Sequence, residues 1–237
     1  TDSGALTISG TSSFTTSANN ATIALDTTTN AFTGAVTITT NDNSGTDADV
    51  TIDGRTTALI LAASTIDGDL TVRNGNSITD NGTVTVGGNL AATTDDNNGV
   101  INLGTLAVDG TVALTTNGSG NATVVNDAGL NFAASTVGGA LNATATTGNM
   151  TDSGALAVTG TSSFTTSANN ADITLNNTNA FTGAVALNTT GSSGHATVVD
   201  ASGLNLGSST VGGNLIATAT TGNMTDSGAL AISGTSS

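Results

Sequence analysis

The side chains that could do chemistry in this chain are almost all aspartates. Its 17 acidic residues are all Asp, beside two Arg, one His and no Cys. The densest acidic group is Asp42, Asp47, Asp49 and Asp53. Calcium takes six to eight oxygen ligands, and a loop of this kind can supply them. These four residues are therefore the candidate metal ligands, with calcium as the only candidate cofactor. The opposing interpretation is that Asp is an ordinary turn residue, since no EF-hand spacing with a closing acid is present.

A second set of aspartates recurs at long intervals. Asp2, Asp80, Asp152 and Asp226 each follow a Thr in the same short sequence. Their separation exceeds the size of a metal site, so we interpret them as turn residues.

The composition offers few side chains that could act in catalysis. His195 is the only histidine, and a general base needs a positioned partner or nucleophile. A glycoside-cleaving groove needs converging carboxylates and usually aromatic platforms for the sugar, whereas the chain has no Glu, Lys, Trp or Tyr. We therefore predict that the protein is not an enzyme and has no catalytic residues.

The charge balance excludes polyanionic partners. The formal net charge is -15, and nucleic-acid binders need Lys and Arg to neutralise phosphates. No run of about 20 apolar residues is present, so no membrane insertion is expected. Low hydrophobicity with net charge also fits a disordered chain. The ordered rows of apolar residues described below argue against disorder.

Internal repeats dominate the sequence. The sequence Thr-Asp-Ser-Gly-Ala-Leu begins at Thr1, Thr151 and Thr225, and a variant of it begins at Thr79. The intervals between these starts are nearly equal. They divide a single repeat domain, residues 1–237, into the super-repeats 1–78, 79–150, 151–224 and a partial 225–237.

A shorter period lies inside each super-repeat. Apolar residues stand two before, two after and four after a recurring glycine, with mostly polar or small residues between them. This period-2 alternation predicts strands with one buried face. The recurring glycines are Gly10, Gly34, Gly68, Gly88, Gly110, Gly139, Gly160, Gly183, Gly213 and Gly234.

Similar segments of this length predict the stacked coils of an all-β, right-handed parallel β-helix, or β-solenoid. With one glycine of the row per coil, there are about nine to ten coils of 20–34 residues, and three coils make one super-repeat of about 74 residues. The right hand is assumed from the variable coil length. A longer loop on every middle coil is expected to project sideways roughly every 14 Å. A propeller needs longer blades, and a sandwich gives no reason for one residue type at a fixed offset.

Several of these motifs resemble a known family. The sequences Gly88-Asn-Leu-Ala-Ala, Gly139-Ala-Leu-Asn-Ala and Gly213-Asn-Leu-Ile-Ala are similar to repeats of filamentous-haemagglutinin-like adhesins. These adhesins are exoproteins of two-partner secretion and related autotransporter systems. The likeness covers nearly the whole chain, although its super-period is more regular than is typical and the family's N-terminal secretion domain is absent from this sequence. The resemblance implies a β-solenoid that is secreted to the bacterial cell surface.

We therefore expect a structural repeat segment of an extracellular fibre or adhesin shaft. Residues 1–13 and 225–237 are almost identical, so self-association end to end, or continuation within one longer chain, is expected. Surface-layer or matrix proteins share this composition. The alternative is a binding module that recognises a host receptor or glycan through lateral loops, at Asn41–Asp49, Asn117–Asn121 and Thr190–His195.

Overall fold

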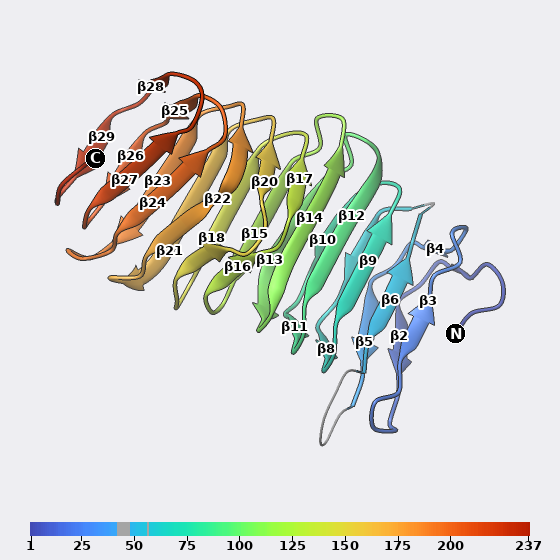
Figure 1. Ribbon diagram of the computed structural model, residues 1–237. Helices are drawn as coiled ribbons and strands as arrows, with labels where there is room; N and C mark the ends of the chain where they lie inside the picture. The colour runs from blue at the N-terminus through green and yellow to red at the C-terminus, as the bar shows by residue number, and fades with distance from the viewer. Residues whose placement is uncertain (42–47, 56) are drawn as a thin grey trace.

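The protein is a β-solenoid of stacked parallel strands (Figure 1). The computed structural model describes residues 1–41, 48–55 and 57–237. The prediction of an all-β parallel solenoid is confirmed, because the strands among these residues pair in parallel along the whole stack. The N- and C-termini lie at opposite ends of the stack. No helix in the described ranges is long and apolar enough to cross a bilayer. The right hand of the coil stays a prediction.

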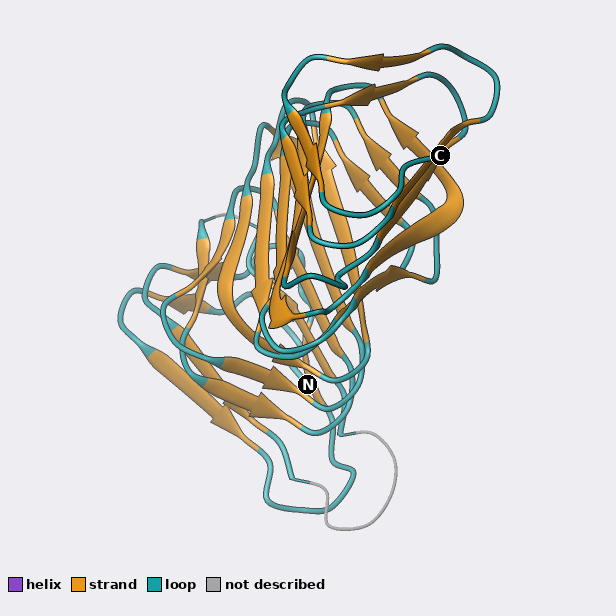
Figure 2. Ribbon diagram, turned by 90° about the vertical axis from the view of Figure 1, so that its left-hand side faces the viewer, coloured by secondary structure: helices purple, strands orange, loops and turns teal. Residues whose placement is uncertain are grey.

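Two large sheets form the walls of the solenoid, and Figure 2 shows them nearly end-on, joined by corners. Sheet I contains β2 (Ser12–Thr15), β5 (Val36–Thr39), β7 (Leu59–Leu61), β8 (Ser64–Ile66), β10 (Ile78–Asp80), β11 (Val84–Val86), β13 (Ile101–Val108), β15 (Ala122–Asn126), β18 (Leu141–Ala145), β21 (Ser162–Asn169), β23 (Val185–Thr190), β25 (Leu204–Leu206), β26 (Ser209–Val211), β28 (Met224–Asp226) and β29 (Leu230–Ile232). Sheet II contains β3 (Ile23–Leu25), β6 (Val50–Asp53), β9 (Leu70–Asn74), β12 (Leu90–Asn97), β14 (Thr111–Asn117), β16 (Leu130–Phe132), β17 (Ser135–Val137), β19 (Met150–Asp152), β20 (Leu156–Val158), β22 (Ile173–Phe181), β24 (Ala196–Asp200) and β27 (Leu215–Ala219). A small third sheet pairs β1 (Thr7–Ile8) with β4 (Ala31–Phe32).

Each residue of a strand lies beside a residue one coil further along the chain. Leu59 pairs with Ile78 across a short coil, and Ile23 pairs with Val50 across a long one. About ten coils result. At about 4.8 Å per coil the rod is on the order of 48 Å long.

The super-repeat spans three and a half coils, which corrects the three coils predicted from the sequence. From β10 to β18 the chain passes the two sheets seven times, beginning and ending in sheet I. From β19 to β27 it again makes seven passes, beginning and ending in sheet II. Each super-repeat therefore starts on the sheet opposite to the one before. The lateral loops of successive super-repeats consequently lie on alternate edges of the rod, not on one edge at a regular spacing.

The recurring glycines do not form one column, so the coil predicted between Gly34 and Gly68 does not exist. Gly68, Gly88 and Gly110 stack in one column, where Gly88 donates its N–H to Gly68 (3.0 Å) and Gly110 to Gly88 (3.0 Å). Gly139 and Gly160 stack in another, with a 2.9 Å bond. A Cβ at Gly110 or Gly160 would collide with the backbone of the coil below, which explains the glycines. The two sheets accept the same short sequence, so the sequence pattern could not distinguish them.

The core is a single apolar column between the sheets. The inward residues predicted from the alternation are buried in the interior coils, for example Val36, Leu70 and Leu141. Aromatic rings pack against one another within it: Phe164 lies edge-on to Phe132 (6.3 Å between centroids) and to Phe181 (5.7 Å). Burial of these side chains by the neighbouring coils supplies most of the stabilisation, since a single coil has no closed interior.

One coil of each super-repeat contains a bulge stabilised by a buried serine. The hydroxyl oxygens of Ser64, Ser135 and Ser209 accept the backbone N–H of a residue in the preceding coil, each at 3.0 Å. Each hydroxyl also donates to the carbonyl two residues earlier, at 2.8–2.9 Å. The side chain thus replaces a ladder hydrogen bond that the extra residue removes.

Candidate functional site

The predicted acidic cluster divides between described and undescribed residues. Asp42 and Asp47 lie outside the described residues. Asp49 immediately precedes β6, and Asp53 is its last residue, so four strand positions, about 13 Å, separate them. The calcium site of all four residues stays a prediction.

Both described members of this cluster already have backbone partners. Asp49 Oδ1 accepts the N–H of Asp69 at 2.8 Å, and Asp53 Oδ1 accepts the N–H of Arg55 at 3.0 Å. Asp53 is only 3% exposed, and burial raises its pKa although Arg55 and Arg73 oppose the shift. Across residues 1–41, 48–55 and 57–237, no three His, Cys, Asp or Glu side chains gather as a metal centre would require.

The recurring aspartates do more than the predicted turn role. Asp80 accepts the N–H groups of Gly104 (3.0 Å) and Thr105 (2.7 Å) in the next coil. Asp152, the equivalent residue of the following super-repeat, accepts the N–H groups of Asn176 (3.0 Å) and Asn177 (3.2 Å). We call this arrangement the inter-coil clasp: one carboxylate that holds two successive N–H groups of the coil above. Its sequence signal was the recurrence of Asp in phase with the super-repeat.

The first aspartate makes a similar clasp at the N-terminal end. Asp2 Oδ2 accepts a hydrogen bond from the side-chain amide of Asn30 at 2.8 Å. Burial works against ionisation there, but hydrogen bonds from Asn30 and Thr27 outweigh it and lower the pKa of Asp2. The carboxylate is therefore held in its charged form by the coil above.

His195 has a structural environment. Its Nδ1 accepts the N–H of Asn214 at 2.8 Å, and its own backbone N–H is bonded to Asp172 at 2.7 Å. The imidazole therefore supports the next coil from the outside of the rod, in a position that Asn121 takes in the preceding super-repeat, where Asn121 Oδ1 accepts the N–H of Ala140 at 2.7 Å.

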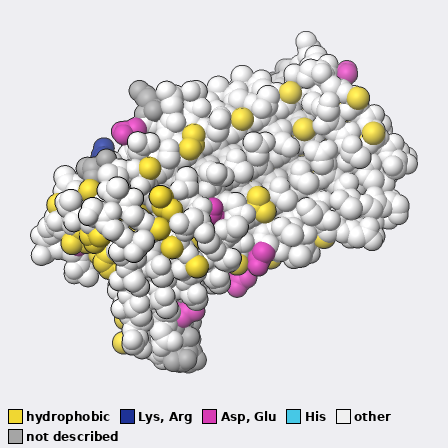
Figure 3. Space-filling model, turned by 180° about the vertical axis from the view of Figure 1, so that it is seen from behind, with side chains coloured by type: hydrophobic (Ala, Val, Ile, Leu, Met, Phe, Trp, Pro, Cys, Tyr) yellow, Lys and Arg dark blue, Asp and Glu magenta, His cyan; other side chains and the backbone are white. Residues whose placement is uncertain are grey.

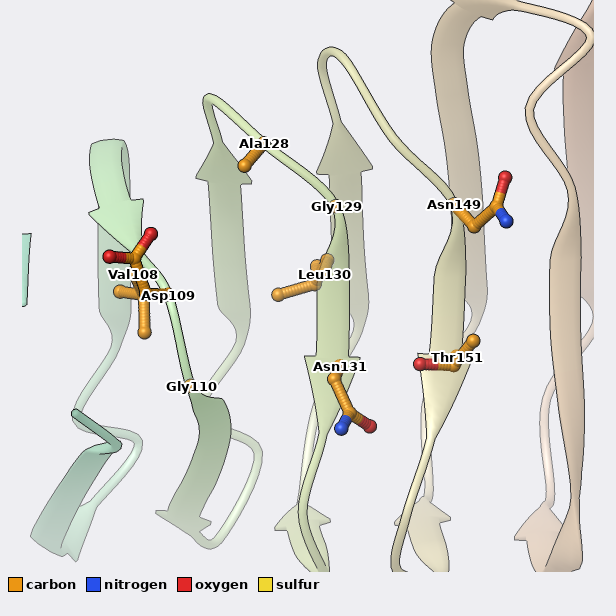
Figure 4. Close-up of a pocket in the computed structure, with 9 residues that line it drawn as sticks. All are labelled: Val108, Asp109, Gly110, Ala128, Gly129, Leu130, Asn131, Asn149 and Thr151. Carbon is orange, nitrogen blue, oxygen red and sulfur yellow. The ribbon is translucent and has the colours of Figure 1, made fainter. Parts of the chain in front are cut away.

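A shallow hollow of about 340 Å³ lies on the side of the rod, beside the strands β14, β16 and β19 (Figure 4). Asp109 contributes the one carboxylate among its lining residues, with the amides of Asn131 and Asn149 and the hydroxyl of Thr151. This set can bind water and small polar groups but holds no acid–base pair. On the face shown in Figure 3, the acidic side chains are scattered along the rod, and apolar ones gather toward one end.

The predicted lateral loops are short, tied corners. The Thr116 hydroxyl donates to the carbonyl of Gly120 (2.7 Å), and Thr189 does the same to Gly194 (2.8 Å). The corner at 117–121 connects sheet II to sheet I, and the corner at 190–195 connects sheet I to sheet II, so the two lie on opposite edges. Most of the loop Asn41–Asp49 lies outside the described residues. Recognition of a receptor or glycan through these loops stays a prediction.

A hollow is present at each end of the described stack. At the C-terminal end a hollow of about 480 Å³ is lined by Leu206, Leu215, Ala217, Met224, Leu230, Ile232, Ser236 and Ser237. At the N-terminal end a hollow of about 440 Å³ is lined by Thr1, Asp2, Leu6, Ser13, Phe14, Thr15, Thr16, Thr22, Ile23 and Leu25. Each hollow is the cross-section of the core where the stack stops, and each presents unpaired strand edges.

Fold and contacts define a β-solenoid repeat protein. The chain belongs to the family described as repeats of unknown function, DUF5649, whose pattern matches residues 1–39, 47–96, 119–188 and 193–237. No curated protein and no solved structure shows a significant match to the chain. Membership confirms a repeat protein, whereas the haemagglutinin-like or autotransporter type stays a prediction.

Proposed function

We propose that this chain is a structural segment of an extracellular fibre or adhesin shaft at the bacterial cell surface. The observation that carries the proposal is the parallel ladder of about ten coils around one apolar core. A stack of this kind resists bending because each coil is bonded to its neighbours along both sheets. Its length grows linearly with the number of repeats, which suits a spacer.

The polar interior supports the same role. Serine bulges, threonine corners and aspartate clasps each bond one coil to the next or close a corner, rather than converge on a common point. Each such bond gives a partner to a backbone N–H or C=O group. The acidic surface adds self-repulsion between rods, which favours solubility.

Hydrogen exchange followed by mass spectrometry tests this proposal. We expect slow exchange in the strands of the interior coils, β12 to β23, and faster exchange in the first and last coils. Electron microscopy of the same sample should show straight rods. Rapid exchange through the interior coils, or flexible particles, would contradict a rigid shaft.

A second candidate function is binding through the lateral corners. The corners at 117–121 and 190–195 have the same construction and lie on opposite edges, an arrangement that would let one fibre contact partners on both sides. Glycan-array and cell-binding measurements on the chain test it. Loss of binding after replacement of one corner by the sequence of its neighbour would support binding through the corners. If the chain binds nothing, the structural shaft remains as the proposed function.

A further inference from the structure

Several corners of the stack are tied by the same polar contact, in which a side chain accepts the backbone N–H that follows a glycine of the next coil. Asn121 Oδ1 accepts the N–H of Ala140 at 2.7 Å, and Gly139 directly precedes Ala140. A Cβ at Gly139 would collide with Asn121 Oδ1, so the glycine lets the side chain come this close. We call this contact the corner link. Side-chain oxygens make the same link at Asp69, Asn89 and Asn214.

His195 makes the corner link with an imidazole nitrogen. Its Nδ1 accepts the N–H of Asn214 at 2.8 Å, and Gly213 directly precedes Asn214. A Cβ at Gly213 would collide with Nδ1, so the ring lies against the backbone of the coil above. A ring nitrogen accepts a hydrogen bond only when it carries no proton. The link at His195 therefore needs the neutral ring with its proton on Nε2.

The charged surroundings of this ring lie on one side. In the coil below, Asp172 Oδ1 accepts the backbone N–H of His195 at 2.7 Å. The corner above, residues 212–214, and the ring's own corner, residues 190–194, contain no titratable side chain. A positive charge on the imidazole would therefore be attracted to the coil below. Its Nδ1–H would at the same time face the N–H of Asn214, so the coil above would lose its acceptor.

We propose that His195 is a pH-sensitive link between two neighbouring coils. Both coils are interior at this corner, since Asn214 is itself linked to Thr235 of the coil above it. The neutral ring holds the N–H of Asn214 in the coil above, and the protonated ring releases it and turns to Asp172 in the coil below. Histidine side chains change charge between about pH 5 and 8, whereas an amide oxygen such as that of Asn121 does not titrate there. Acidification thus loosens one corner of the stack and leaves the links made by Asn in place.

The loosening stays local, because backbone hydrogen bonds flank the link. Gly213 donates its N–H to Gly194 O at 2.8 Å, and Ala196 donates its N–H to Asn214 O at 2.9 Å. Neither bond involves the imidazole. The inference therefore goes beyond the proposed shaft and does not alter it. The rod stays stacked at acid pH, while the corner at Gly213 and Asn214 opens more often.

Residue-specific amide exchange, measured by NMR on the whole chain at about pH 5 and about pH 8, tests the link. After correction for the intrinsic effect of pH on exchange, the protection of the Asn214 amide should fall about tenfold at the lower pH, as the loss of one hydrogen bond predicts. The protection of the Ala140 amide, which Asn121 holds, should change by less than about twofold. Equal protection of Asn214 at both pH values, or an equal fall at both amides, would overturn the inference.

Two reciprocal substitutions control for fraying of the stack and for titration of the aspartates. His195→Asn gives this corner the side chain that stands at Asn121, so the Asn214 amide should keep its protection at both pH values. Asn121→His places an imidazole against Gly139, and the pH response should then appear at the Ala140 amide. A response of Asn214 that persists in His195→Asn overturns the role of the imidazole, whether or not Asn121→His folds.

The ring itself gives a second readout. Nitrogen chemical shifts distinguish a protonated from an unprotonated ring nitrogen, and at about pH 8 Nδ1 of His195 should be the unprotonated one. A neutral ring with its proton on Nδ1 would overturn the link.

The outcomes separate this inference from the proposed function. Slow exchange in the interior coils without a pH response at Asn214 overturns the link and leaves the shaft intact. Rapid exchange throughout the interior coils contradicts the shaft itself.

Discussion

One short sequence has different surroundings in two parts of the molecule. Met-Thr-Asp-Ser-Gly-Ala-Leu runs from Met150 to Leu156 in the interior and from Met224 to Leu230 in the last coil. Both copies form a strand over their first three residues. In the interior copy Met150, Asp152 and Leu156 are buried and the aspartate is clasped. In the terminal copy the equivalent three residues are exposed, and the aspartate makes no side-chain hydrogen bond in the described chain.

This difference shows that the strand is a local property, whereas burial belongs to the stack. A coil contributes a core only when another coil lies on each side of it. Substitutions of equivalent residues in the two copies therefore measure what the neighbouring coil adds, at constant local sequence.

The largest expected effect comes from the apolar residue of the pair. Leu156→Ala should destabilise the fold by about 2–5 kcal/mol, because it opens a cavity in a packed core. Leu230→Ala should cost about 1 kcal/mol or less, because the side chain is already partly in water. Chemical denaturation followed by circular dichroism measures both, with hydrogen exchange to detect fraying of the last coil. Equal effects would show that the last coil is covered in solution.

The aspartates of the two copies give the next comparison. Asp152→Ala leaves the N–H groups of Asn176 and Asn177 without their acceptor, and should cost about 1–3 kcal/mol. Asp226→Ala removes the same charge from an exposed position and should change stability by about 0.5 kcal/mol or less. Denaturation midpoints of the two variants give the difference. Equal midpoints would mean that the clasp adds nothing beyond its charge.

A smaller effect is expected for the outer surface of the stack. Arg73 pairs with Asp95 through Nε (2.7 Å) and Nη2 (3.2 Å), and this partner raises the pKa of Arg73. Arg73→Gln should cost about 0.2–1 kcal/mol at low salt, whereas Arg55→Gln serves as a control of equal charge. The difference between the two should vanish near about 1 M salt. If it persists there, the arginine acts through packing of its stem.

The smallest effect concerns pH. Burial raises the pKa of Asp53 above that of the unfolded chain, so the folded state binds its proton more readily. Stability from this residue is therefore full at low pH and falls as pH rises through the raised pKa. Asp53→Asn should remove that fall while keeping the bond from Arg55 N–H. Denaturation at a series of pH values from below the ordinary Asp pKa to neutrality measures it. An unchanged pH slope would contradict a buried, perturbed carboxyl.

Much of the fold followed from the sequence alone. Period-2 alternation predicted inward residues such as Val36, Leu90 and Leu141, and burial confirms them. The super-repeat predicted a stack of similar units, because repeated sequence must form repeated structure. Alternation is local, depending only on which way each side chain points from its strand.

The phase of the repeat was decided only by the tertiary structure. The two sheets accept the same Gly-x-apolar sequence. The sequence pattern therefore does not show whether the next recurring glycine lies on the same sheet, a whole coil further on, or on the opposite sheet, half a coil off. The clasp of Asp152 on Asn176 was equally hidden, because its partner is set by how many residues complete one coil. The strands, the rows of core residues and the repeat therefore follow from local sequence patterns. Stacking decides which residues of neighbouring coils are in contact, because that depends on the length of every corner between them.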